Sequence, residues 1–174
     1  ALTMGGREYA AVAGDQPPDA RADAATLVRL VAQGSMALPT FGSNDGQFPG
    51  SAGQGRLVGP PPQTAAERHA LAVIYTALLT LACADRLDPD RRLVLDGSFL
   101  RDPAFAALVA ALRPGRETLV NPAGNGIAAG AARLCSHGAP PAPLTLHPPA
   151  PIPGLPDLTD YAARWRVLAK DIPT

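Results

Sequence analysis

The chain has 174 residues, of which 47% are hydrophobic and 17% charged, and its formal net charge is zero. This length fits one compact domain, or one and a fraction, with enough apolar residues to bury a core. No strong overall field would attract nucleic acid or anionic lipid, so the composition argues against both kinds of partner and favours a small ligand.

The two cysteines and the apolar runs indicate where such a protein would work. Cys83 and Cys135 lie in apolar, helix-like segments without Cys-x-x-Cys spacing, which predicts buried free thiols and a cytoplasmic location. The longest apolar run, residues 70–84, is interrupted by Thr76 and Thr80 and is too short to span a bilayer. We therefore expect no membrane segment.

The first elements in chain order are a hairpin and a helix. Gly5 and Gly6 form a turn dipeptide, and residues 8–13 have strand character, which predicts a hairpin at a sheet edge. The opening residues resemble the middle of a strand, so we expect the chain to be the later part of a longer polypeptide. Residues 19–34 carry apolar side chains at helical spacing, which predicts an amphipathic helix.

A long loop and a central helix follow. Residues 38–62 are rich in Gly, Pro and Ser with scattered aromatics, which predicts an irregular segment of a length that is often functional. Residues 64–87 begin with Thr64 and Glu67 at the spacing of a capping box. Their apolar residues cover most sides, so this helix should be buried in a layered fold, with His69 on its polar side.

Two strand–helix units come next. In the first, a strand at residues 93–95 precedes a helix that starts at Asp102-Pro103 and runs to about Leu112. In the second, a strand at residues 118–120 precedes a helix at residues 127–136. This order predicts parallel strands joined by right-handed crossovers, with helices covering the sheet.

The last part is rich in proline. Proline favours extended chain here, so the tail either wraps a surface or acts as a linker. A final helix at residues 157–168, with Tyr161 and Trp165 at helical spacing, could dock the tail on the body.

The turns after both strands are the candidate ligand site. Ligands of open parallel sheets bind beyond the carboxyl ends of the strands, where helix N-termini present free N–H groups. Gly97 would let a planar ligand approach the backbone, Ser98 adds a hydroxyl, and Asp102 either caps its helix or accepts a hydrogen bond from the ligand. The turn at residues 124–126 also admits close approach. The alternatives are an ordinary capped turn at the first site and tight helix packing at the second.

Four segments together resemble the FGGY carbohydrate kinases. "DGSFLRDPAFAALVAAL" and "NPAGNGIAAGAARL" are similar to the adenosine motif and the following Gly-Ala-Ala helix of that family. "TMGGREYAAVAG" resembles the hairpin after its phosphate segment, and "LPTFGSNDGQFPG" resembles its Pro-x-Phe, glycine and aromatic-Pro loop. The resemblance covers about residues 3–134. It departs from the family at Ser98-Phe99, where relatives have glycine and a small residue, so the adenine shelf should be narrower or differently shaped.

The resemblance implies an α/β fold of the actin-like ATPase, ribonuclease-H-like type, present in part, with a mixed sheet and flanking helices. Residues 1–136 would form the nucleotide-binding domain and residues 137–174 a proline-rich tail with a short helix. The implied activity is ATP-dependent phosphorylation of a sugar or polyol, with Mg²⁺ held through the phosphates of ATP or ADP. The residues assigned to the nucleotide are Gly42, Gly46, Gly97, Ser98, Asp102, Asn125 and Gly126.

The same resemblance leaves parts of the enzyme outside this chain. The catalytic base, the phosphate loops and the sugar-binding domain of the family lie upstream, so no catalytic residue is assigned and the chain alone should be inactive. The histidines lack metal-ligand spacing, and no metal ligand is assigned. A homodimer is a further expectation. The alternative function is a non-catalytic module, for nucleotide sensing or protein interaction, that retains half a kinase fold.

Overall fold

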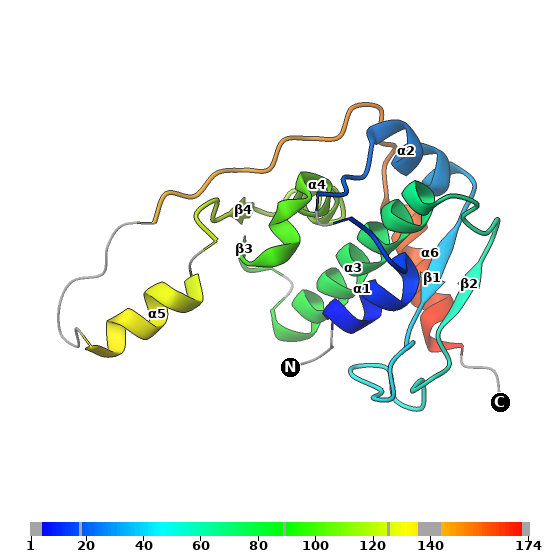
Figure 1. Cartoon of the computed structure of the whole chain (residues 1–174), viewed down its shortest axis with the longest axis horizontal. Helices are drawn as coiled ribbons and strands as arrows, with labels where there is room; N and C mark the ends of the chain where they lie inside the picture. The colour runs from blue at the N-terminus through cyan, green and yellow to red at the C-terminus, as the bar shows by residue number, and fades with distance from the viewer. Residues whose placement is uncertain (1–4, 18, 89, 125, 136–143, 172–174) are drawn as a thin grey trace.

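The computed structural model describes residues 5–17, 19–88, 90–124, 126–135 and 144–171 (Figure 1). The elements in chain order are α1 (Gly5–Ala13), α2 (Ala24–Ala32), β1 (Met36–Leu38), β2 (Arg56–Val58), α3 (Ala65–Leu87), β3 (Leu93–Leu95), the 3-10 helix η1 (Ser98–Arg101), α4 (Pro103–Ala111), β4 (Thr118–Val120), α5 (Gly126–Cys135) and α6 (Thr159–Lys170).

Helix α3 is the centre of the core, as its sequence predicts. The Thr64 side chain accepts from the Glu67 N–H at 3.1 Å, and the Glu67 carboxylate accepts from the Thr64 N–H, which completes the capping box. Helices α1, α2 and α4 and strand β1 pack against α3. Its length and mean hydropathy would suit a membrane span. However, 61% of its most apolar 18-residue stretch is buried within the protein, as is typical of a core helix.

The predicted hairpin at the start of the chain is wrong, because residues 5–13 form helix α1. Glu8 and Val12, one helical turn apart, are buried together with Ala13, and α1 packs along α3. A period of four residues, rather than the alternation of a strand, therefore decides which side chains enter the core. Helix α2 is shorter than predicted because Asp23 caps it, accepting from the Thr26 N–H at 2.9 Å.

The segment expected to be irregular contains two short strands. Strands β1 and β2 pair antiparallel, with Met36 opposite Val58 and Leu38 opposite Arg56. All three residues of β1 are buried, since β1 lies between α3 and α6. The connecting residues 39–55 remain irregular.

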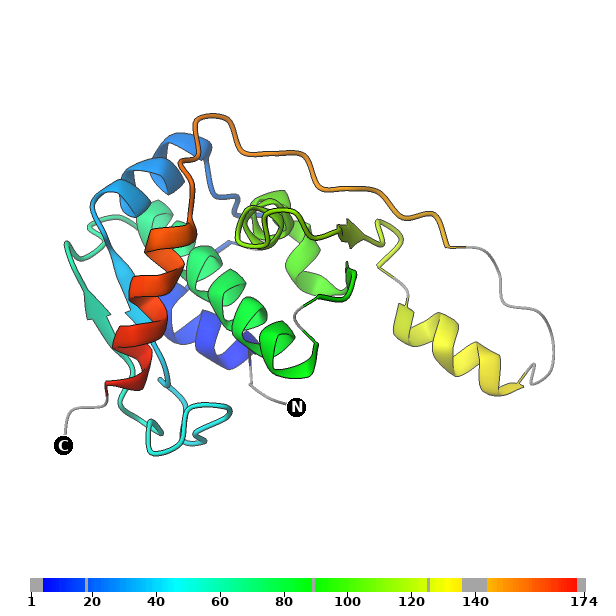
Figure 2. The ribbon, with the colours of Figure 1, turned by 180° about the vertical axis from the view of Figure 1, so that it is seen from behind.

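Strands β3 and β4 pair in parallel, which confirms the predicted strand–helix units. Leu93 lies opposite Thr118 and Leu95 opposite Val120. The proline-rich tail adds one antiparallel bridge, in which the Val120 N–H donates to the His147 carbonyl at 2.8 Å. The described part of the tail then runs across the molecule to α6 (Figure 2).

Helix α6 docks on the body, as predicted. Trp165 is 1% exposed and donates from its indole N–H to the Ala37 carbonyl at 2.7 Å, while the Tyr161 hydroxyl donates to the Ser35 carbonyl. Figures 1 and 2 show α6 on the side of α3 opposite to α1.

Helix α5 differs from the expected covering helix, because none of its residues is buried. It stands away from the other described elements in Figure 1, with Ile127 93% and Leu134 81% exposed. Cys135, at its end, is exposed rather than buried as predicted, and Cys83 is half-buried.

Candidate functional site

One carboxylate joins the turns that follow β3 and β4. The Asp96 side chain accepts from the Gly97 N–H at 2.6 Å and, through its other oxygen, from the Gly126 N–H at 2.8 Å. The Asn121 amide donates to the same second oxygen at 3.2 Å. The structure therefore brings together Gly97 and Gly126, two residues that the sequence assigns to one site. The sequence did not predict this role of Asp96, because an Asp-Gly pair after a strand is also typical of an ordinary turn.

Both glycines have a steric reason to be glycine. Gly97 has φ +98° and ψ −167°, a region that only glycine readily adopts, and no atom lies within 4 Å of the position its Cβ would take. Its outer face is therefore open to a ligand. At Gly126 a Cβ would collide with the Asp96 carboxylate, so the Asp96 contact needs a residue without a side chain.

Asp102 caps α4, and both of its oxygens are engaged inside the protein. One oxygen accepts from the Ala104 N–H at 2.9 Å; the other accepts from the Ala22 N–H at 2.9 Å and lies 2.7 Å from His69 Nε2. Burial opposes its ionisation, but the hydrogen bonds from His69, Ala22 and Ala104 outweigh this and lower the pKa of Asp102 below its ordinary value. Asp102 is thus an internal acceptor that joins α3 to the N-terminus of α4.

His69 is buried, which corrects the expectation of a solvated histidine. It is 4% exposed, and its Nδ1 lies 2.7 Å from the Tyr9 hydroxyl. Because a carboxylate only accepts, Nε2 carries the hydrogen toward Asp102, and in the neutral ring Nδ1 accepts from Tyr9. In the sequence, the sign that His69 is buried is its place one helical turn before Val73, which is also buried. The groups that bind its ring nitrogens belong to other elements.

The Asp102–His69–Tyr9 chain borders an open cavity of about 260 Å³. Burial, and then the charge of Asp102, raise the pKa of Tyr9, so its hydroxyl stays protonated. Phe99 forms an aromatic wall, with its ring 5.9 Å from that of Tyr9 and 5.2 Å from that of Phe105. Ser98 and Asp102 also line the cavity. Its volume is slightly below the usual range for small-molecule pockets, and it suits one ring system rather than a whole nucleotide.

Gly42 and Gly46 lie in loop 39–55, which Figure 1 shows apart from the ends of β3 and β4. Glu8 of α1, 1% exposed, anchors this loop by accepting from the Phe41 N–H at 3.0 Å, the Gly42 N–H at 2.8 Å and the Tyr75 hydroxyl at 2.5 Å. Helix α1 therefore contacts the loop through Glu8 and the cavity through Tyr9.

The remaining residue that the sequence assigns to the nucleotide, Asn125, lies outside the described residues.

The acidic residues near the end of α3 are paired with arginines. Asp85 lies 2.7 Å from Arg166, and Asp88 lies 2.8 Å from Arg91. Within the described ranges, no three His, Cys, Asp or Glu side chains are grouped as metal ligands.

Comparison with known proteins identifies the family. The sequence model described as "Carbohydrate kinase FGGY, C-terminal domain" matches residues 1–143. The chain belongs to this family. No curated protein sequence matches this chain significantly.

A solved structure also resembles this chain. The crystal structure of a carbohydrate kinase from Novosphingobium aromaticivorans aligns with a TM-score of 0.74 and 28% identity, over 95% of this chain and 36% of that one. The chain thus spans about a third of the length of that kinase. The likeness confirms the predicted α/β actin-like ATPase fold.

Proposed function

We propose that this FGGY domain is the nucleotide-binding lobe of an ATP-dependent kinase that phosphorylates a sugar or polyol hydroxyl. The observation that carries the proposal is the pair of strand-end turns held together by Asp96, beside the open backbone of Gly97. This position, beyond the carboxyl ends of parallel strands, is where open α/β sheets bind ligands.

The residues at the strand ends fit ATP or ADP. Gly97 offers an unobstructed backbone face, and the adjacent cavity between Tyr9 and Phe99 offers aromatic walls for a base. His69 and Asp102 fix the Tyr9 hydroxyl at the edge of that cavity. When bound, ATP supplies the phosphoryl group for transfer, and Mg²⁺ would be held through its phosphates.

Two surfaces of the chain support its role as one lobe of a larger enzyme. Helix α5 exposes Ile127 and Leu134, and β3 exposes 41% of Val94, so both elements have apolar side chains that the described residues leave exposed. Such surface is typical of contacts with further protein. The sugar-binding groups and the catalytic aspartate are then expected in the part of the kinase that the chain does not span.

Nucleotide binding tests the proposed site. We expect ADP, measured by isothermal titration calorimetry, to bind the wild-type chain and to bind Gly97→Val at least 10-fold more weakly. Gly115→Val is the matched control, because Gly115 also has a positive φ (+76°) and open space around it, but lies between α4 and β4. Equal ADP affinity of Gly97→Val and the control would refute the site.

Turnover tests the lobe assignment. We expect no sugar-dependent ADP release when the 174-residue chain is incubated with ATP, Mg²⁺ and a panel of pentoses, hexoses, ketoses and polyols. The physical reason is positioning: phosphoryl transfer needs an in-line hydroxyl and a proton acceptor, and a nucleotide lobe alone provides neither. Sugar-dependent turnover by this chain would contradict the assignment. Failure to bind ADP as well would contradict the nucleotide site itself.

A further inference from the structure

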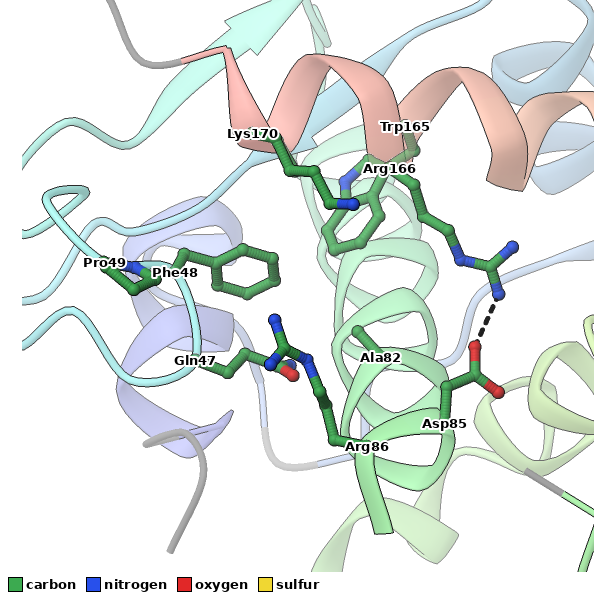
Figure 3. A pocket seen from close by; sticks show the side chains of 10 residues that line it. Gln47, Phe48, Pro49, Ala82, Asp85, Arg86, Trp165, Arg166 and Lys170 are labelled. Carbon is green, nitrogen blue, oxygen red and sulfur yellow. Dashed lines mark hydrogen bonds and ion pairs between the residues drawn. The ribbon is translucent and has the colours of Figure 1, made fainter. Parts of the chain in front are cut away.

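A second cavity, of about 420 Å³, lies between loop 39–55, the end of α3 and α6 (Figure 3). It shares no lining residue with the cavity beside Tyr9 and His69. Its far wall belongs to α6, which lies beyond the residues that match the FGGY family. The cavity therefore depends on a segment that the family match does not explain.

The floor of this cavity is apolar and held in place. Trp165 is 1% exposed, and its indole N–H donates to the Ala37 carbonyl at 2.7 Å. The Phe48 ring meets the Trp165 ring edge-on, with centroids 5.9 Å apart and planes at 88°. Ala82 and Ala169 leave room above the rings. Phe48 is half-buried and presents the accessible ring, which Trp165 holds in place, and such a rigid aromatic surface suits a ring-shaped ligand.

The rim is positively charged. Asp85 is the carboxylate at the rim, and it is already paired with Arg166 at 2.7 Å. Arg86 and Lys170 form no ion pair with any described residue, although both side chains line the cavity. Figure 3 shows them extending into it from opposite walls, Arg86 from α3 and Lys170 from α6. Two cations are thus available to one anionic group.

We propose that this cavity binds a small phosphate monoester of a sugar or nucleoside. Arg86 and Lys170 would hold the phosphate, since a guanidinium donates in pairs to phosphate oxygens and an ammonium adds a mobile positive charge. The sugar or base would lie against the Phe48 ring, which Trp165 supports from below. The site is independent of the proposed nucleotide site and of the kinase activity.

The test uses the fluorescence of Trp165, which is the only tryptophan of the chain, with calorimetry as a second readout. The probes are glucose 6-phosphate, AMP, inorganic phosphate and glucose. We expect saturable binding of at least one of the two esters, at least 10-fold tighter than binding of glucose or inorganic phosphate. Whichever of glucose 6-phosphate and AMP binds more tightly shows whether the cavity prefers a sugar phosphate or a mononucleotide. Raising the salt concentration from 50 to 300 mM should weaken binding of this ester several-fold.

Charge variants locate the site. Arg86→Gln and Lys170→Gln should each weaken the ester at least 10-fold. The matched control is Arg91→Gln, which removes the same charge from an 83% exposed side chain that lies outside the cavity and should change affinity less than twofold. Arg86 and Lys170 are exposed, so thermal unfolding should not change. Equal affinity for glucose and its phosphate, equal affinity of all three variants, or no binding of either ester would overturn the proposal.

Discussion

Replacing Glu8 by alanine removes the acceptor that three donors share between α1, α3 and loop 39–55. The Tyr75 hydroxyl and the Phe41 and Gly42 N–H groups would lose their carboxylate partner in the interior. Burial, and then the hydrogen bond to Glu8, raise the pKa of Tyr75, so this hydroxyl remains a donor that needs an acceptor. An unpaired buried donor costs about 1–3 kcal/mol.

The expected loss follows from these contacts. Because water can reach part of the vacated space beside the half-exposed Phe41 and Gly42, we expect Glu8→Ala to lower the free energy of unfolding by about 3–5 kcal/mol. Glu8→Gln keeps one acceptor oxygen but places an N–H₂ group where the other accepted, so about 2 kcal/mol should be lost. A typical domain is stable by only about 5–15 kcal/mol, so Glu8→Ala removes a large share of the stability.

Urea unfolding followed by Trp165 fluorescence measures both variants. The control is Glu117→Ala, because the Glu117 side chain is 58% exposed and its ion pair with Arg92 is long, at 3.6 Å. This change should cost less than about 1 kcal/mol. The reasoning is refuted if Glu8→Ala is no more destabilising than Glu117→Ala. Limited proteolysis should also cut loop 39–55 faster in Glu8→Ala, since its anchor is lost.

Two further predictions concern the strand-end site. The lowered pKa of Asp102 means that its carboxylate stabilises the fold above about pH 4, the ordinary range of the group, and that this contribution is lost as the pH falls further. Between about pH 4 and 2 the free energy of unfolding, from urea titrations, should therefore fall more steeply for wild type than for Asp102→Asn; parallel curves would contradict this. Gly126→Ala should displace the Asp96 carboxylate, cost about 1–3 kcal/mol and weaken ADP binding, whereas Gly130→Ala, with open space around it in the same helix, should do neither. Equal unfolding midpoints and equal ADP affinities of these two alanine variants would show that the Asp96 contact is dispensable.

Local signals in the sequence were sufficient for several elements. The capping box of Thr64 and Glu67, and the Asp102-Pro103 start of α4, are formed by residues within a few positions of one another. The triplets Leu-Val-Leu at residues 93–95 and Thr-Leu-Val at residues 118–120 likewise identified both parallel strands. Their hydrogen bonds and periods are set by neighbouring residues, so a sequence window contains the information that defines them.

Only the tertiary structure decided where the buried polar groups belong. Glu8 accepts from the hydroxyl of Tyr75, 67 residues away, and this contact links helix α1 (residues 5–13) to α3 in the core. His69 is buried because Asp102 and Tyr9, 33 and 60 residues away, satisfy its ring nitrogens. A buried polar side chain is stable only when its partners are in place, and those partners are brought together by folding rather than by position in the chain.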